Sequence, residues 1–138
     1  MTTILPLPKI EITDLSSVQE DRPVALLTGE RSWAAVSPLL VLPLVVQAEP
    51  YRVEVDYLDS LASDLPPQVG VVYGVGGGMV ADAAKYVGWK RGLPVVIIPT
   101  SLSQDGFFTA LVAARSDGTV NYVTTGPAEK LVIDWEVI

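Results

Sequence analysis

The chain has 138 residues, 49% of them hydrophobic, and a formal net charge of −7 at pH 7. This size and composition suit one domain with a single core, and nine Lys and Arg residues scattered along an acidic chain argue against a nucleic-acid partner. With no cysteine and no histidine, the chain has no disulfide, no thiolate or imidazole metal ligand and no imidazole base.

The first 22 residues are expected to form an N-terminal arm or a lead-in strand that adds no core element. Pro6 and Pro8 interrupt this segment, and the polar run SSVQED follows them. The N-terminus lacks the basic and long apolar regions of a signal peptide, and no apolar run reaches the roughly 18 residues of a membrane span. We therefore expect a cytoplasmic protein without a membrane partner.

Residues 23–138 are expected to form the folded domain, because regular patterning begins at Pro23. Short apolar runs alternate with segments of helical periodicity, a pattern typical of a parallel sheet covered on both faces. The sequence predicts a Rossmann-like α/β fold with a mostly parallel sheet and helices on both faces. The predicted elements are strands 24–28, 41–47, 69–76 and 93–101 and helices 31–40, 56–65 and 78–92.

The pattern changes after Phe107, where two strand-like runs surround Asp117 and Gly118. Asp-Gly between such runs predicts a β-hairpin. The segment KLVIDWEVI, residues 130–138, is predicted to be a last strand, and the chain ends inside this apolar run.

Three consecutive glycines, Gly76, Gly77 and Gly78, stand between a predicted strand and a predicted helix. Glycines at such a junction let a ligand approach the backbone, and the helix amino end favours an anion, so a phosphate or pyrophosphate is the expected guest. The alternative is a tight turn in which the glycines only let the helix pack on the sheet.

Neither standard phosphate motif is complete at these glycines. Gly74 and Gly76 fit the start of G-x-G-x-x-G, but Met79 occupies its last position. The motif G-x-x-x-x-G-K-[ST] fails because the nearest lysine is Lys85.

The segments GVGGGMVADAAKY and LPVVIIPTSLSQDGFFTAL together resemble the nucleotide-binding half of the superfamily of iron-containing alcohol dehydrogenases, glycerol dehydrogenase, glycerol-1-phosphate dehydrogenase and dehydroquinate synthase. The glycerol-1-phosphate dehydrogenase branch is the most similar. The family's three glycines with an Asp four places later occur here as Gly76–Gly78 and Asp82. Its motif P-T-x-x-S-x-D-G occurs here as Pro99, Thr100, Ser103, Asp105 and Gly106.

The resemblance implies that Gly76, Gly77 and Gly78 bind the pyrophosphate of NAD or NADP, with Asp82, Thr100 and Ser101 also at the cofactor. Each has a structural alternative: Thr100 and Ser101 can form a turn after Pro99, and a carboxylate at Asp82 suits the first turn of a helix. Residues 23–138 would then be a dinucleotide-binding domain.

The resemblance also implies that Asp105 is one ligand of a catalytic zinc or iron ion whose other ligands are histidines of a second, helical domain. This chain has no histidine, so its metal site would be incomplete. By itself, an Asp-Gly pair indicates a turn. Gln104 stands where the glycerol-1-phosphate branch commonly has His, which leaves the substrate open.

Ribose recognition is expected after the first strand, where Glu30 could accept hydrogen bonds from NAD and repel the extra phosphate of NADP. A solvated glutamate at a helix start is the alternative for Glu30.

Three functions are compatible with these motifs. The first is the NAD(P)-binding domain of a metal-dependent oxidoreductase acting on glycerol 1-phosphate or a similar polyol or alcohol, inactive without its helical domain. The second is a domain of a dehydroquinate synthase-like cyclase, although DGFFTAL, residues 105–111, resembles the dehydrogenases instead. The third is a stand-alone, non-catalytic nucleotide-binding module that self-associates as a homo-oligomer.

Overall fold

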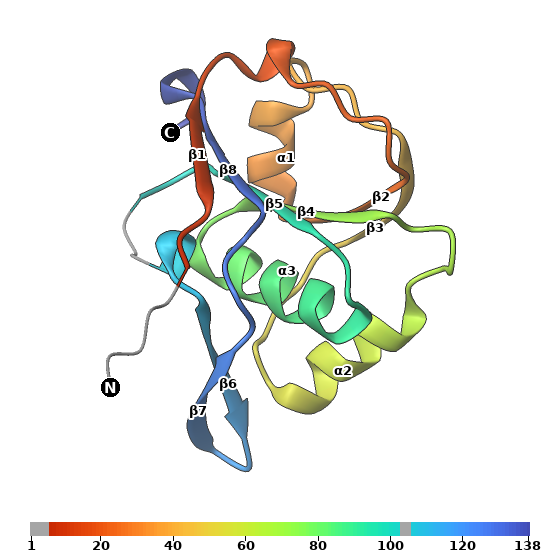
Figure 1. Cartoon of the computed structure of the whole chain (residues 1–138), viewed down its shortest axis with the longest axis vertical. Helices are drawn as coiled ribbons and strands as arrows, with labels where there is room; N and C mark the ends of the chain where they lie inside the picture. The colour runs from red at the N-terminus through yellow and green to blue at the C-terminus, as the bar shows by residue number, and fades with distance from the viewer. Residues whose placement is uncertain (1–5, 103–105) are drawn as a thin grey trace.

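Six parallel strands form one sheet with helices on both faces (Figure 1), which confirms the predicted α/β class. The computed structural model describes residues 6–102 and 106–138. The sheet has the order β1-β8-β5-β4-β2-β3. Its strands are β1 (Lys9–Ile12), β2 (Val24–Thr28), β3 (Leu44–Ala48), β4 (Val71–Gly76), β5 (Val95–Pro99) and β8 (Lys130–Ile133). The helices are α1 (Glu30–Val36), α2 (Val55–Asp64) and α3 (Gly78–Arg91).

The central strands are apolar at successive positions because both faces of the sheet are covered. Leu26 and Ile98 pack in the cluster that contains Val36 of α1. Their neighbours Leu27 and Ile97 point to the other face and pack with residues of α2 and α3. In Figure 1, α1 lies above the sheet and α2 and α3 lie below it.

The predicted hairpin is confirmed as β6 (Leu111–Ser116) and β7 (Thr119–Thr124), an antiparallel pair outside the main sheet. Asp117 and Gly118 join the two strands and both have positive φ, at 51° and 77°. Asp and Gly tolerate this geometry, so the turn follows directly from the sequence. Within the described residues, no helix combines the length and the apolarity needed to cross a membrane.

Four predicted strands are longer than the observed ones. Those expected over 69–76 and 93–101 are observed as Val71–Gly76 and Val95–Pro99. The strand expected from residue 41 begins at Leu44, after Pro43, which has no N–H to donate to a neighbouring strand. The strand expected over 130–138 ends at Ile133, and Trp135–Val137 form a 3₁₀ turn instead. This turn is capped by Asp134, whose Oδ1 accepts a hydrogen bond from the Glu136 N–H at 3.0 Å.

The N-terminal segment contributes more than the sequence predicts. A lead-in strand does form, since β1 pairs in parallel with β8. However, Leu15 is only 1% exposed and belongs to the core cluster on the α1 face. Its N–H donates to Asp134 Oδ2 at 2.9 Å, which fixes the segment to the end of β8. The segment thus forms a lead-in strand, as one of the two expected forms, and also contributes Leu15 to the core.

Candidate functional site

The candidate site lies at the carboxyl ends of the neighbouring strands β2 and β4. The connections that follow these two strands lead to opposite sides of the sheet. From β2 the chain continues through α1 to β3 on one side, whereas from β4 it continues through α3 to β5 on the other. The helices that follow these two strands cover opposite faces. In open α/β sheets, ligands bind in the crevice at such a switch point.

The three glycines form the turn between β4 and α3. Gly76 ends β4 with φ at 154°, a conformation that residues with a side chain rarely adopt. Gly77 is the N-cap of α3 and makes no side-chain cap, and the helix begins at Gly78. A Cβ at Gly77 would have as its nearest neighbour Ser101 Oγ, at 3.9 Å. No other side chain of the described residues comes closer to that position, so an anion could reach the amino end of α3.

Thr100 and Ser101 follow β5 and lie beside this turn. The Thr100 N–H donates to the Gly76 carbonyl at 3.0 Å, and Thr100 Oγ1 lies 3.0 Å from Ser32 Oγ. The structure therefore brings Gly76, Gly77, Thr100 and Ser101 together. Ser32, in the first turn of α1, joins this group and was missed, because its approach depends on how α1 crosses the end of β4.

Asp82 differs from its predicted setting. It is not in the first turn of α3, which contains no acidic residue, but one turn further along. Its carboxylate is 20% exposed and forms an ion pair with Lys85 Nζ at 3.9 Å. Burial raises the pKa of Asp82 to about 6, although the charge of Lys85 opposes this shift.

Lys85 is the buried partner of this pair, with 2% exposure. Its Nζ donates to the carbonyls of Thr109 at 3.1 Å and Leu111 at 2.9 Å. Burial lowers the pKa of Lys85, and the Asp82 charge acts in the opposite direction. The pair thus connects α3 to the start of the hairpin, a role that the sequence motifs did not reveal.

The predicted metal ligand, Asp105, lies outside the described residues, together with Ser103 and Gln104. In the ranges 6–102 and 106–138, no three His, Cys, Asp or Glu side chains gather closely enough to hold a metal ion. The donors in this part of the chain therefore do not fit a catalytic metal site, and no chemical step is assigned to a metal here.

A cleft with a volume of about 540 Å³ opens at the ends of β2 and β3. Its size falls in the range of small-molecule sites. Glu30, the predicted ribose contact, is exposed at the start of α1 and lines this cleft. The full lining consists of Thr28, Gly29, Glu30, Trp33, Ala34, Gln47, Ala48 and Glu49.

Comparison with known proteins gives concordant results. A sequence model described as iron-containing alcohol dehydrogenase matches residues 15–138. A glycerol-1-phosphate dehydrogenase [NAD(P)+] of Thermofilum pendens is 38% identical over 68 residues, which cover 49% of this chain and 20% of that relative.

Two solved structures show the same fold. Glycerol dehydrogenase from Schizosaccharomyces pombe superposes with a TM-score of 0.83 and 22% identity, over 99% of this chain and 40% of that one. Sulfoacetaldehyde reductase from Bifidobacterium kashiwanohense, in complex with NAD+, gives a TM-score of 0.81 and 12% identity, over 99% of this chain and 47% of that one. The chain thus spans less than half the length of each of these three proteins.

Proposed function

We infer from the membership of this chain in the iron-containing alcohol dehydrogenase family that it is the dinucleotide-binding part of an NAD(P)-dependent oxidoreductase. The observation that carries this proposal is the amino end of α3 at Gly77, which lies beside Thr100 and Ser101 at a switch point of the sheet and which the side chains of residues 6–102 and 106–138 leave open. In this proposal, residues 23–138 form the binding domain.

The backbone of Gly76, Gly77 and Gly78 would hold the pyrophosphate. The amino end of a helix carries unsatisfied N–H groups and a partial positive charge, which together favour an anion. Thr100, Ser101 and Ser32 supply hydroxyl groups on the same side. When bound, the nicotinamide accepts or donates the hydride. The residues of this chain orient the cofactor and keep its phosphates fixed.

Asp82 is a positioning residue in this proposal. Its carboxylate and Lys85 connect α3 to the base of the hairpin and so keep the amino end of α3 in place.

The substrate of the whole protein is proposed to be glycerol 1-phosphate or a similar polyol or alcohol, in line with the activity of the Thermofilum pendens relative. The metal is proposed to be zinc or iron, with Asp105 as one ligand and the others in a helical domain that is not part of this chain. A homo-oligomer and a cytoplasmic location complete the proposal. The family match is to dehydrogenases, which favours this proposal over the cyclase alternative.

Calorimetric titration of the purified chain with NAD+ and NADP+ tests the proposal. We expect binding of at least one dinucleotide, and no oxidation of glycerol 1-phosphate or glycerol by this chain with added zinc or iron, because its sequence has no histidine to complete a metal site. Failure of both dinucleotides to bind at millimolar concentration would rule the binding function out.

A further inference from the structure

The cleft at the ends of β2 and β3 begins next to the glycine loop. The parallel register pairs Thr28 of β2 with Val75 of β4, so Gly29 follows β2 at the level where Gly76 ends β4. Ser32 of α1 lies between the cleft and the glycine loop, since its Oγ is 3.4 Å from the position that a Cβ on Gly76 would occupy. A dinucleotide whose pyrophosphate lies at α3 would therefore have its neighbouring ribose within reach of this cleft.

Glu49 reaches over the floor of the cleft. It follows β3, and its Oε1 lies 3.8 Å from the position of a Cβ on Gly29. Because Gly29 has no side chain, the space between this carboxylate and the end of β2 is open. The Thr28 hydroxyl is already engaged and donates to the Val75 carbonyl at 2.7 Å. The Glu49 carboxylate is thus the polar group that extends over Gly29.

We propose that this cleft receives the adenosine ribose and that Glu49 makes the chain selective for NAD over NADP. The inference rests on the dinucleotide-binding function proposed above. It assigns the selectivity to Glu49, directly after β3, rather than to Glu30, the candidate named from the sequence.

The chemistry of the two cofactors supports this assignment. A carboxylate accepts hydrogen bonds from the free ribose hydroxyls of NAD, whereas the 2′-phosphate of NADP brings further negative charge to the same position. Among the described residues that line the cleft, there is no Lys or Arg to compensate that charge. Repulsion between like charges at a protein surface is expected to weaken NADP+ binding about tenfold, which corresponds to about 1.4 kcal/mol.

Glu49 is expected to repel the 2′-phosphate of NADP more strongly than Glu30 does. Glu30 is the first residue of α1, so the partial positive charge of the helix amino end offsets part of its field. Glu49 lies outside any helix, between β3 and α2. In the described part of the chain, neither carboxylate is engaged in an ion pair.

The test is a calorimetric titration of the full chain with NAD+ and NADP+. Wild type is expected to bind NAD+ about tenfold or more tightly than NADP+, Glu49→Gln to lose most of this preference, and Glu49→Lys to reverse it. Glu136→Gln is the matched control, because it removes the same charge from an exposed side chain that does not line the cleft. Its preference should equal that of wild type.

The outcomes separate the inference from the function on which it rests. If wild type and Glu49→Gln bind NAD+ with the same preference over NADP+, Glu49 does not determine selectivity and the inference is overturned, while dinucleotide binding stands. If wild type binds neither dinucleotide, the function and the inference both fail.

Discussion

Within the described part of the chain, Gly77 leaves the amino end of α3 open without depending on a special backbone conformation. Its φ of −89° and ψ of −165° are accessible to other residues. A methyl group there would lie 3.9 Å from its nearest neighbour, Ser101 Oγ, which is an ordinary contact. Glycine at this position is therefore dispensable for folding but needed if a phosphate approaches the backbone.

Replacing Gly77 by Ala is predicted to weaken NAD+ binding about tenfold, because the methyl group displaces the phosphate from N–H donors that each contribute about 1.5 to 3 kcal/mol to a charged acceptor. The melting temperature should fall by only a few degrees, because Ala is a poorer N-cap than Gly. Calorimetry and circular dichroism measure the two effects. Gly70→Ala, just before β4 at the opposite end of the sheet, is the control and should bind as wild type. Unchanged affinity in Gly77→Ala would exclude the glycine loop as the phosphate site.

At the scale of elements, α3 lies close to β4 and β5 because two glycines remove side chains from the contact. A Cβ on Gly74 of β4 would lie 2.7 Å from Ala84 Cβ. A Cβ on Gly88 of α3 would collide with the side chain of Val95 in β5. This close packing fixes the amino end of α3 relative to the crevice, so it also positions Gly77.

Gly88→Ala is predicted to lower the free energy of unfolding by about 2 kcal/mol, as overpacking in a dense core does. Val95→Ala alone should also destabilise, through the cavity that it leaves. In the double variant the new methyl group fills that cavity, so the combined loss should be smaller than the sum of the two single losses. Urea denaturation of the four proteins measures the coupling. Strict additivity would show that Gly88 and Val95 do not share this contact.

The alternation of strands and helices along the chain is predictable from the sequence. The adjacent apolar residues Leu26 and Leu27 also indicate that both faces of β2 are buried. The glycine loop and its neighbour Thr100 were also predictable, because strand ends in a parallel sheet meet at one edge. In contrast, the packing role of Gly88 depends on the distance between α3 and β5, which no local pattern encodes. The approach of Glu49 to Gly29 likewise depends on the register between β2 and β3, which shifts between Val24 and Ala25.

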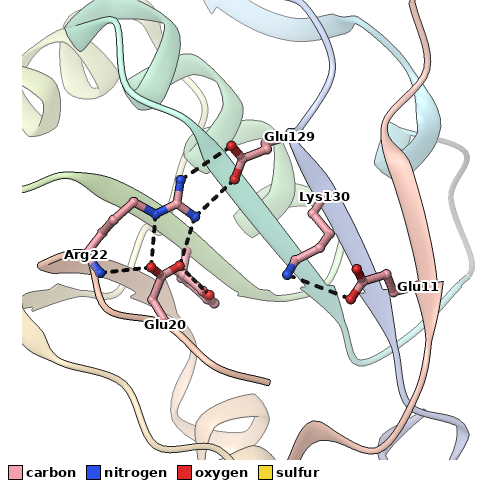
Figure 2. Close-up of polar contacts among 6 residues, drawn as sticks. Glu11, Glu20, Arg22, Glu129 and Lys130 are labelled. Atoms are coloured by element: carbon pink, nitrogen blue, oxygen red, sulfur yellow. Dashed lines mark hydrogen bonds and ion pairs between the residues drawn. The ribbon is translucent and has the colours of Figure 1, made fainter. Parts of the chain in front are cut away.

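An ion-pair network lies at the end of the sheet opposite the glycine loop and ties together segments that are distant in sequence (Figure 2). The Glu20 carboxylate is 4% exposed and accepts hydrogen bonds from Arg22 Nε at 2.9 Å and from the Tyr73 hydroxyl at 2.8 Å. Arg22 Nη2 also donates to Glu129 Oε2 at 3.0 Å, next to β8. The network therefore connects the N-terminal segment, β4 and the start of β8.

This network predicts a loss of stability in acid. Burial would raise the pKa of Glu20, but hydrogen bonds from Arg22 and Tyr73 outweigh it and lower the pKa from 4.5 to about 2. Because the folded-state pKa is lowered, the contribution of Glu20 is fully present above about pH 4.5 and disappears as the pH falls towards 2. Thermal melting between pH 2 and pH 7 should therefore show a smaller acid-induced decrease for Glu20→Gln than for wild type.

The Glu20→Gln variant should also be less stable than wild type at neutral pH, since Arg22 loses its charged partner. Glu136→Gln, at an exposed position, is the control and should follow the wild-type curve. Parallel melting curves for Glu20→Gln and wild type over the whole pH range would contradict the lowered pKa.

The central claim is that this chain binds a dinucleotide by its pyrophosphate at the amino end of α3. Titration of the ¹⁵N-labelled chain with NAD+, followed by two-dimensional NMR, tests it most directly. The account predicts that the largest amide shifts occur at Gly76, Gly77, Gly78 and Thr100, with no change at Arg22 at the opposite end of the sheet. Saturable shifts that leave the glycine loop unaffected, or no shifts at all, would contradict it.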